Sequence, residues 1–278
     1  MRSPAAVAIA LLSALFAAAA HAAEPESVDL LITRGHVLTL NDRREVIRDG
    51  VIAIRGERIV AVGDSALATR FRASRVIDAR GGLVLPGMIN AHTHASMTVF
   101  RGLGDDVPDR LKRFIFPLEK HFVDREVVHW GALHGIIEMI EGGVTTFTDM
   151  YYFEEEVARA ARLAGMRGVL GQTIVNFPAP DTPEPYGGIA LARRFITTHH
   201  GDPLITPALA PHAPYTVEPE RLREIAKLAE ELDAPVLMHV AEMTDEVAAL
   251  RRDHNLTPVG HLAAAGLLNR RLVAAHCI

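Results

Sequence analysis

The sequence has 278 residues, of which 49% are hydrophobic and 23% are charged, so it can bury a large core and lacks the composition of a disordered chain. Its formal net charge of −5 is offset by no cluster of Lys or Arg, which excludes a nucleic-acid partner because phosphate binding needs a basic surface. A single cysteine excludes an internal disulfide, whereas 14 histidines supply many candidate metal ligands.

Residues 1–22 have the pattern of a cleavable signal peptide. Arg2 gives a positive start, residues 5–20 are apolar apart from Ser13, and Ala20-His21-Ala22 fits the small-x-small rule for cleavage. The alternative is a transmembrane anchor, but this apolar run is shorter than the roughly 20 residues that a span needs. We therefore expect a secreted or periplasmic protein without a stable membrane anchor.

Residues 23–82 are predicted to form a small antiparallel β-module. Short apolar segments at 30–33, 36–40, 51–54 and 59–62 are separated by the turn signals Arg34-Gly35, Asp49-Gly50, Gly56-Glu57 and Gly63-Asp64. Alone, such a module has too little core, so we expect it to pack on another part of the protein.

Residues 83–278 alternate between apolar strands and amphipathic helices. One helical face is predicted from Leu133, Ile136, Ile137 and Ile140, and a second from Leu222, Ile225, Ala229 and Leu232. The spacing is typical of an α/β protein with a parallel sheet, and its regularity favours a (β/α)8 TIM-type barrel. The candidate strands are residues 83–92, 145–151, 168–175, 205–212, 235–240 and 272–277.

A closed barrel needs eight strands, and the sixth candidate strand ends the sequence. We therefore expect an incomplete barrel from a truncated product or partial gene. A six-stranded open variant is the alternative.

Histidines lie at the predicted strand ends, where the active site of a barrel is built. His92 and His94 follow the first strand and share one side of it, which is good geometry for a metal. His239 ends the fifth strand, and Glu242 lies in the turn just beyond it. Three histidines with a carboxylate nearby would leave zinc an open position for water and a base to take its proton.

His212 and His276 end the fourth and sixth predicted strands. Either could be a hydrogen-bonded structural histidine, but their positions favour substrate contact or orientation of a water. The lysines of the sequence, Lys112, Lys120 and Lys227, do not lie at a predicted strand end. A lysine carbamate bridging two metals is therefore absent, which favours a single-metal site.

Four ordered motifs resemble the amidohydrolase superfamily, and within it the methylthioadenosine/S-adenosylhomocysteine deaminase and chlorohydrolase-like branch. They are Pro86-Gly87-Met88-Ile89-Asn90-Ala91-His92-Thr93-His94, Pro211-His212-Ala213-Pro214-Tyr215, His239-Val240-Ala241-Glu242 and Ala275-His276-Cys277. The resemblance extends from about residue 28 to residue 278. It implies that the β-module is half of a composite sandwich and that the protein forms a homo-oligomer.

The resemblance also implies a role for each site residue. His92, His94 and His239 would hold one divalent metal, zinc or, as in some relatives, iron. Glu242 would move a proton from the metal-bound water to a ring nitrogen of the substrate, and His276 would orient the attacking hydroxide. His212 would touch the substrate, and Glu119 would grip ribose hydroxyls.

The sequence departs from the family pattern in three places. The last metal ligand of the family, an Asp after strand eight, has no counterpart. The segment Asp109-Arg110-Leu111-Lys112-Arg113 lacks the Trp that often precedes the Pro117-Leu118-Glu119 stretch. Gln172 stands where the deaminases have an Arg, which weakens the case for a substrate with a carboxylate tail.

The predicted function is that of a metal-dependent hydrolase of C–N bonds other than peptide bonds. A metal-bound hydroxide would deaminate a small molecule, either an adenine-type nucleoside or a related amino-heterocycle. One alternative is a chlorohydrolase of s-triazines or other heterocycles, or a cyclic amidohydrolase. A second alternative is an inactive truncated paralogue that only binds metal.

Overall fold

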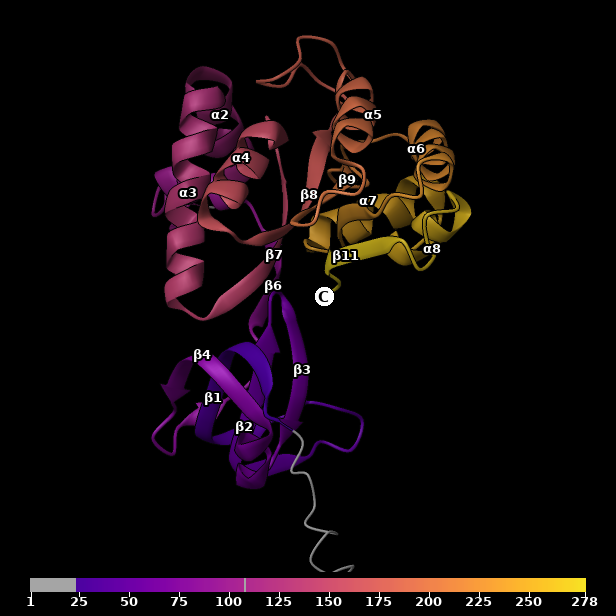
Figure 1. Ribbon diagram of the computed structural model, residues 1–278. Helices are drawn as coiled ribbons and strands as arrows, with labels where there is room; N and C mark the ends of the chain where they lie inside the picture. Colours follow the sequence, from indigo (N-terminus) through magenta and orange to yellow (C-terminus); the bar gives the residue numbers. More distant parts are fainter. Residues whose placement is uncertain (1–23, 108) are drawn as a thin grey trace, which may run out of the picture. The chain divides into compact units, whose positions relative to one another are not determined.

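The structure, a computed structural model, describes residues 24–107 and 109–278 (Figure 1). The predicted signal peptide, residues 1–22, lies outside the described part of the chain. The chain divides into two compact units, Met1–Pro86 and Gly87–Ile278.

The first unit is a five-stranded mixed sheet with a short 3-10 helix, η1 (Ser65–Arg70). The strand order is β3-β2-β1-β4, with β5 also paired to β1. The pairs β1–β2 and β2–β3 are antiparallel as predicted, but β4 and β5 run parallel to β1. The strands are β1 (Glu26–Leu38), β2 (Val46–Arg55), β3 (Arg58–Gly63), β4 (Phe71–Asp78) and β5 (Leu83–Val84).

Two turns predicted in this unit are wrong, because the strands continue through them. β1 passes through Arg34-Gly35 as an irregularity with a shifted register, and Arg34 has a φ of 59°. A side chain at position 35 would meet Val84, since a Cβ there would lie 2.5 Å from the Val84 Cγ2 atom. The second predicted turn, Asp49-Gly50, lies inside β2.

The predicted first barrel strand, residues 83–92, is divided in two. Its beginning is β5, which pairs with β1 of the first unit, and its end is β6 (Met88–Thr93). The division between the units therefore falls after Pro86 rather than at the boundary of 82 and 83 expected from the sequence.

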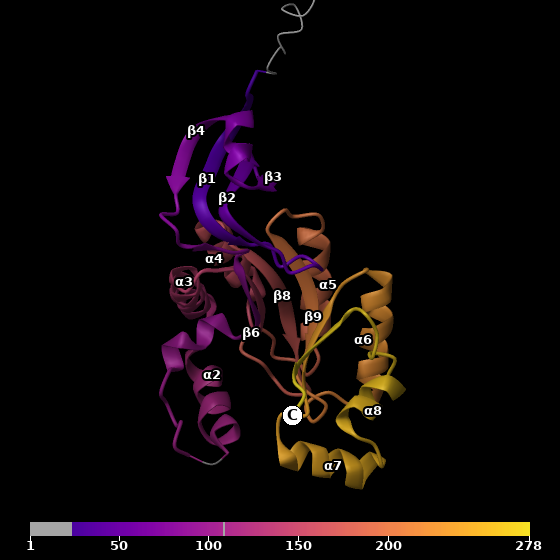
Figure 2. The same cartoon turned by 90° about the horizontal axis from the view of Figure 1, so that it is seen from below.

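The second unit is a sheet of six parallel strands in the order β11-β10-β9-β8-β7-β6, which is also their order along the chain. Helices alternate with the strands and lie around the outside of the sheet (Figure 2). The predicted α/β class with a (β/α)-barrel arrangement is confirmed. After β6 the strands are β7 (Val144–Tyr151), β8 (Arg167–Ile174), β9 (Ile205–Pro211), β10 (Val236–Val240) and β11 (Leu272–His276).

Seven α-helices are described in this unit, and among the described residues no helix is long and apolar enough to span a bilayer. A 3-10 helix, η2 (Ala95–Phe100), follows β6, and a π-helical turn, η3 (Leu111–Ile115), precedes the first α-helix. The α-helices are α2 (Phe116–Phe122), α3 (Arg125–Glu141), α4 (Glu154–Ala164), α5 (Gly188–His199), α6 (Pro219–Glu231), α7 (Thr244–His254) and α8 (Pro258–Ala264).

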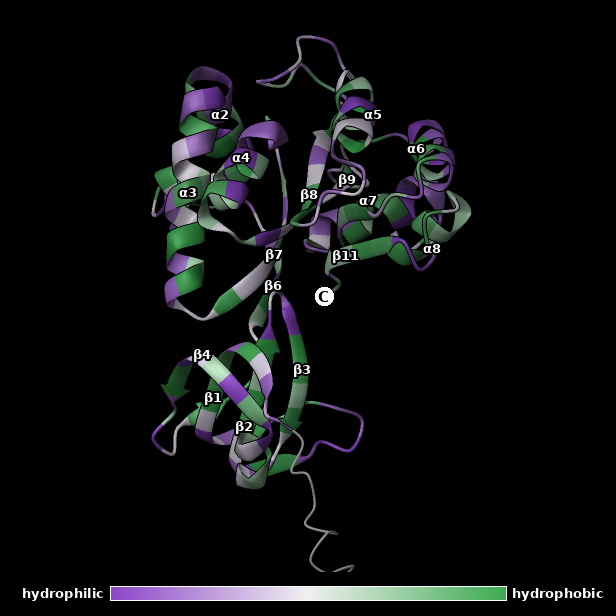
Figure 3. Ribbon diagram, viewed as in Figure 1, coloured by the Kyte–Doolittle hydropathy of each residue, from purple (hydrophilic) through white to green (hydrophobic). Residues whose placement is uncertain are grey.

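The two predicted helical faces had different outcomes. In α6, Leu222, Ile225 and Ala229 are buried against the sheet, as predicted. In α3 only Ile136 of the predicted face is fully buried, whereas Ile137 and Ile140 are 48% and 46% exposed. These isoleucines belong to the apolar stretch in the second half of α3 that Figure 3 shows in green.

Glycines stand at the two positions of α3 where the helix approaches η2 most closely. A Cβ on Gly131 would lie 2.4 Å from the Ser96 carbonyl oxygen, and one on Gly135 would lie 2.8 Å from that of Ala95. Ser96 Oγ and Thr98 Oγ1 donate hydrogen bonds to carbonyl oxygens of α3, both at 3.0 Å. This contact fixes the segment that follows the first histidine motif.

Candidate metal centre

The seven side chains predicted from the sequence line one cavity at the carboxyl ends of the strands, with a volume of about 230 Å³. They come from β6 and its end, α2, β9 and β10 and the turns after them, and β11. Parallel strands bring their carboxyl ends to the same edge of a sheet, which is why residues far apart in the sequence meet here. The seven are His92, His94, Glu119, His212, His239, Glu242 and His276.

Four imidazoles form the centre of this cavity. The His92 ring lies 5.0 Å from the rings of His94 and His239 and 5.1 Å from that of His276, measured between centroids. One nitrogen from each of His92, His239 and His276 lies within 4.8 Å of the others. His94 is not one of these three, but its Nε2 atom is 3.1 Å from Nε2 of His239.

Backbone carbonyls fix the tautomers of two of these rings. His94 Nδ1 lies 2.6 Å from the Met150 carbonyl oxygen, and His239 Nδ1 lies 2.7 Å from that of His212. A carbonyl oxygen only accepts, so each Nδ1 carries the hydrogen and donates it. In the neutral rings both Nε2 atoms are then bare acceptors, and they face each other at 3.1 Å.

Two lone pairs facing each other repel unless a cation lies between them. Two nitrogens bound at 2.0–2.1 Å to one tetrahedral zinc are separated by about 3.3 Å, close to the separation seen here. The Nδ1–H to carbonyl bonds are also the outer contacts that typically orient metal-binding histidines. The residues present therefore fit a divalent metal, with His94 and His239 the best oriented ligands and His92 beside them.

Three histidines of the cavity are kept neutral by burial and, to a smaller extent, by neighbouring imidazoles. Together these effects lower the pKa of His94 to about 4, of His212 to about 3 and of His239 to about 2. The pKa of His92 is also lowered, first by burial and then by His276. Neutral imidazole is the form that binds metal, so the cluster is ready to coordinate at neutral pH.

Glu242 reaches this cluster because the chain turns after β10, as the sequence predicted. Ala241 has a left-handed φ of 52°, and the Glu242 side chain then lines the cavity. Its Oε1 atom lies 3.8 Å from Nε2 of His276, the most exposed histidine of the four. A carboxylate beside a cluster of metal-binding histidines is placed to accept or deliver a proton.

Glu119 lies in the wall formed by α2, and it is 4% exposed. The Tyr151 hydroxyl donates a 2.9 Å hydrogen bond to its Oε1 atom. Burial raises the pKa of Glu119 to about 7, and the bond from Tyr151 opposes that rise only in part. Near neutral pH this side chain can therefore serve as a donor or as an acceptor.

Several residues of the cavity were not predicted. Tyr151 is the last residue of β7 and Tyr152 follows it, a position at a strand end that could have marked them as site residues. Arg110 and Leu111, from the segment that lacks the family Trp, also line the cavity. Gln172 does not line it, because its amide donates a 2.7 Å hydrogen bond to Asp181.

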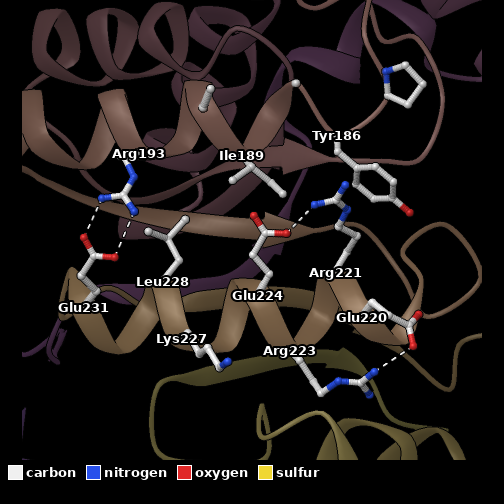
Figure 4. A pocket seen from close by; sticks show the side chains of 13 residues that line it. Tyr186, Ile189, Arg193, Glu220, Arg221, Arg223, Glu224, Lys227, Leu228 and Glu231 are labelled. Atoms are coloured by element: carbon white, nitrogen blue, oxygen red, sulfur yellow. Dashed lines mark hydrogen bonds and ion pairs between the residues drawn. The ribbon is translucent and has the colours of Figure 1, made fainter.

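A larger hollow of about 810 Å³ lies between α5 and α6, on the outside of the second unit (Figure 4). Apart from Lys227, its charged side chains pair with one another: Arg193 with Glu231 at 2.7 Å, Arg221 with Glu224 at 2.6 Å, and Arg223 with Glu220 at 2.8 Å. This groove offers no cluster of metal-binding or nucleophilic groups, and we assign no chemistry to it.

Known proteins resemble this chain in sequence. The sequence model of the amidohydrolase family matches residues 83–278. The 5-methylthioadenosine/S-adenosylhomocysteine deaminase 1 of Syntrophus aciditrophicus is 44% identical over 256 residues, which cover 91% of this chain and 58% of the relative. The 5'-deoxyadenosine deaminase of Methanothermobacter thermautotrophicus is 40% identical over 257 residues, with the same coverage. The chain thus spans a little over half the length of these relatives.

Solved structures resemble it as well. An adenosine deaminase from Xanthomonas campestris with bound zinc superposes with a TM-score of 0.87 at 36% identity, over 90% of this chain and 58% of that one. The zinc complex of the atrazine chlorohydrolase TrzN from Arthrobacter aurescens superposes with a TM-score of 0.76 at 24% identity, over 90% and 61%. The second likeness shows the fold alone.

Proposed function

This chain belongs to the amidohydrolase family, and we propose that it carries the metal site and the proton-transfer residue of a hydrolytic deaminase of adenine-type nucleosides. The observation that carries the proposal is the pair of bare Nε2 atoms of His94 and His239, 3.1 Å apart, with Glu242 in the same cavity. The names of the relatives support the reaction type and the substrate class.

In this proposal His92, His94 and His239 hold one divalent cation. Zinc is favoured because the adenosine deaminase relative contains it, and imidazole also suits iron. When bound, such a cation supplies a hydroxide nucleophile at neutral pH, because it lowers the pKa of water to roughly 7.

Glu242 moves the protons of the reaction. Its carboxylate takes a proton from the attacking water and gives it to the ring nitrogen beside the carbon that carries the amino group. His276, 3.8 Å from that carboxylate, orients the water. The second proton of the water, left on the added oxygen, then passes to the amino group. The C–N bond breaks, the oxygen remains on the ring carbon, and the amino group leaves as ammonia.

Glu119 and His212 position the rest of the substrate. A ribose hydroxyl is both a donor and an acceptor, and Glu119, with its pKa near 7, can match either role. Tyr151 holds the Glu119 carboxyl in place from behind. His212 lies beside the Phe116 ring, 6.1 Å between centroids, where a flat base can contact both.

The test is ammonia release by zinc-loaded protein from adenosine, 5'-methylthioadenosine, S-adenosylhomocysteine and 5'-deoxyadenosine. We expect release from at least one of them, loss of release on chelation, and recovery when zinc is returned. Chloride release from a chlorinated s-triazine tests the alternative reaction. Protein with one zinc per chain that releases ammonia from none of the four would contradict the proposal.

We also propose that the protein is exported. The support is the pattern of residues 1–22, with its apolar run and the small-x-small site at Ala20-His21-Ala22. Mass spectrometry of the protein from a periplasmic fraction should find a new N-terminus at Ala23. An intact Met1 in the mature protein would contradict export by cleavage.

A further inference from the structure

Glu246 is a buried carboxylate that does not line the cavity yet contacts the backbone of the residue that moves protons. It is 4% exposed and lies in the first turn of α7. Its Oε1 atom accepts a hydrogen bond from the Ala241 N–H at 3.1 Å, and its Oε2 atom accepts one from the Glu242 N–H at 2.9 Å. Both oxygens are therefore used on two consecutive amides.

These two amides belong to a turn that is unfavourable by itself. Ala241 has a φ of 52°, a conformation that residues with a Cβ rarely adopt. On its other side the turn is held by backbone bonds only: the N–H of Cys277 donates to the Val240 carbonyl at 2.8 Å, and that of Ile278 to the Ala241 carbonyl at 3.1 Å. Glu246 is the side chain that holds the turn from the opposite side, and we call its two hydrogen bonds to Ala241 and Glu242 the clamp.

A carboxylate is the side chain that the geometry requires. Two parallel N–H donors need two acceptor atoms at a fixed spacing, and a carboxylate supplies them. Glutamine has the same shape but would place its amide NH₂ against one of the two N–H groups. Burying a carboxylate is costly, so its presence here indicates that the turn it holds has a function.

We infer that Glu246 is a positioning residue: it holds the Ala241–Glu242 turn so that the Glu242 carboxylate points at the histidine cluster. The inference rests on the proposed function of Glu242. Proton transfer works over hydrogen-bond distances, and misplacement by about 1 Å can reduce a rate by roughly 100-fold. Loss of the clamp should therefore lower kcat while leaving KM and the metal site unchanged.

The test compares Glu246→Gln with Asp202→Ala in the zinc-loaded full chain. Asp202 serves as the control, because its Oδ1 atom also accepts two backbone N–H bonds, from Leu204 and Ile205, both at 2.9 Å. That contact precedes β9, at the opposite end of the strands from the cavity. Its Oδ2 atom pairs with Arg162 at 2.8 Å, a contact that also lies outside the cavity. Both variants lose a carboxylate that accepts hydrogen bonds from backbone amides, but only the carboxylate of Glu246 binds the Ala241–Glu242 turn.

In Glu246→Gln we expect amide hydrogen exchange at residues 241 and 242 to rise at least tenfold and kcat to fall by roughly 10- to 100-fold, with KM within twofold. In Asp202→Ala exchange should rise only near residues 204 and 205, with kcat within twofold. Unchanged exchange at 241 and 242 would overturn the inference, and so would raised exchange with an unchanged kcat.

If the parent protein deaminates no adenine nucleoside, the proposed function is wrong, but the role of Glu246 can still be tested. Amide hydrogen exchange at residues 241 and 242 and a crystal structure of the zinc-loaded Glu246→Gln variant would then decide that role. A Glu242 carboxylate displaced from its parent position, with exchange raised, supports the inference. An unmoved carboxylate overturns it.

Discussion

Two polar hollows of the second unit differ in chemistry, and the larger one holds the less reactive groups. The groove between α5 and α6 has about 810 Å³ and is lined mostly by charges that pair with one another, as in Arg193–Glu231. The histidine cavity has about 230 Å³, and there two acceptor nitrogens face each other with no donor between them. The difference teaches that the kind of group and its orientation, several neutral imidazoles converging on one point, distinguish the candidate site better than volume or charge does.

The most severe change should be His239→Ala, which removes one of the two facing nitrogens. Loss of an outer contact to a ligand typically weakens metal binding by 10- to 100-fold, so loss of a ligand itself should weaken it by more than about 100-fold and abolish turnover. Zinc content after dialysis against a chelator measures this. His199→Ala, which removes a buried histidine that lies outside the cavity and contacts Glu155 at 2.7 Å, should keep its zinc. Equal zinc contents in His239→Ala and His199→Ala would contradict the assignment of His239 as a metal ligand.

Glu242→Gln should separate proton transfer from metal binding. We expect kcat to fall by about 10²- to 10⁴-fold, the usual contribution of a general acid–base group, while one zinc per chain is retained. Steady-state ammonia release and metal analysis of the same sample measure both quantities. If the zinc is lost as well, Glu242 is a ligand rather than a proton carrier.

Glu119→Gln should change how stability depends on pH. The folded protein keeps the Glu119 proton up to a pKa of about 7, whereas the unfolded chain releases it near 4.5, so this group makes the protein less stable as pH rises from 4.5 to 7. At about 1.4 kcal/mol per pKa unit the loss is roughly 3 kcal/mol.

Urea unfolding of parent and variant at pH 5 and pH 7.5 isolates this contribution, because the buried histidines act in the opposite direction and are common to both proteins. The free energy of unfolding of the variant, relative to the parent, should be higher at pH 7.5 than at pH 5. A pH-independent difference would show that Glu119 ionises normally.

Arg193→Ala should have the smallest effect. The Arg193 and Glu231 side chains are exposed, and solvent screens such a pair so that it adds little to stability. Turnover should be unchanged, and a double-mutant cycle with Glu231→Ala should show almost no coupling between the two side chains. A large loss of turnover would mean that the groove has a function.

Much of the second unit could be predicted because strand-like segments alternate regularly with helical ones, and the ends of parallel strands must meet. That reasoning brought His92, His212, His239 and His276 to one cavity, from four different strands. It also placed Glu242 beside them, once the chain was expected to turn after β10.

The features that could not be predicted depend on contacts between distant segments. The predicted buried face of α3 was wrong because the close approach to η2 requires Gly131 and Gly135 there. A prediction from hydrophobic periodicity does not count glycine as a buried residue. β1 continues through Arg34-Gly35 because pairing with β2 and β5 outweighs a local turn signal. The role of Glu246 was missed because a carboxylate in the first turn of a helix usually only caps that helix.

The tight contact of α3 with η2 also decides which parts of this helix can vary. In a library that randomises α3, positions 137 and 140, which face outward, should accept polar residues freely. Positions 131 and 135 should return glycine after selection, because any Cβ there would push η2 and, with it, the histidine that immediately precedes η2. The pattern of tolerated substitutions along α3 would thus show where its backbone packs closely against the segment that supports the candidate metal site.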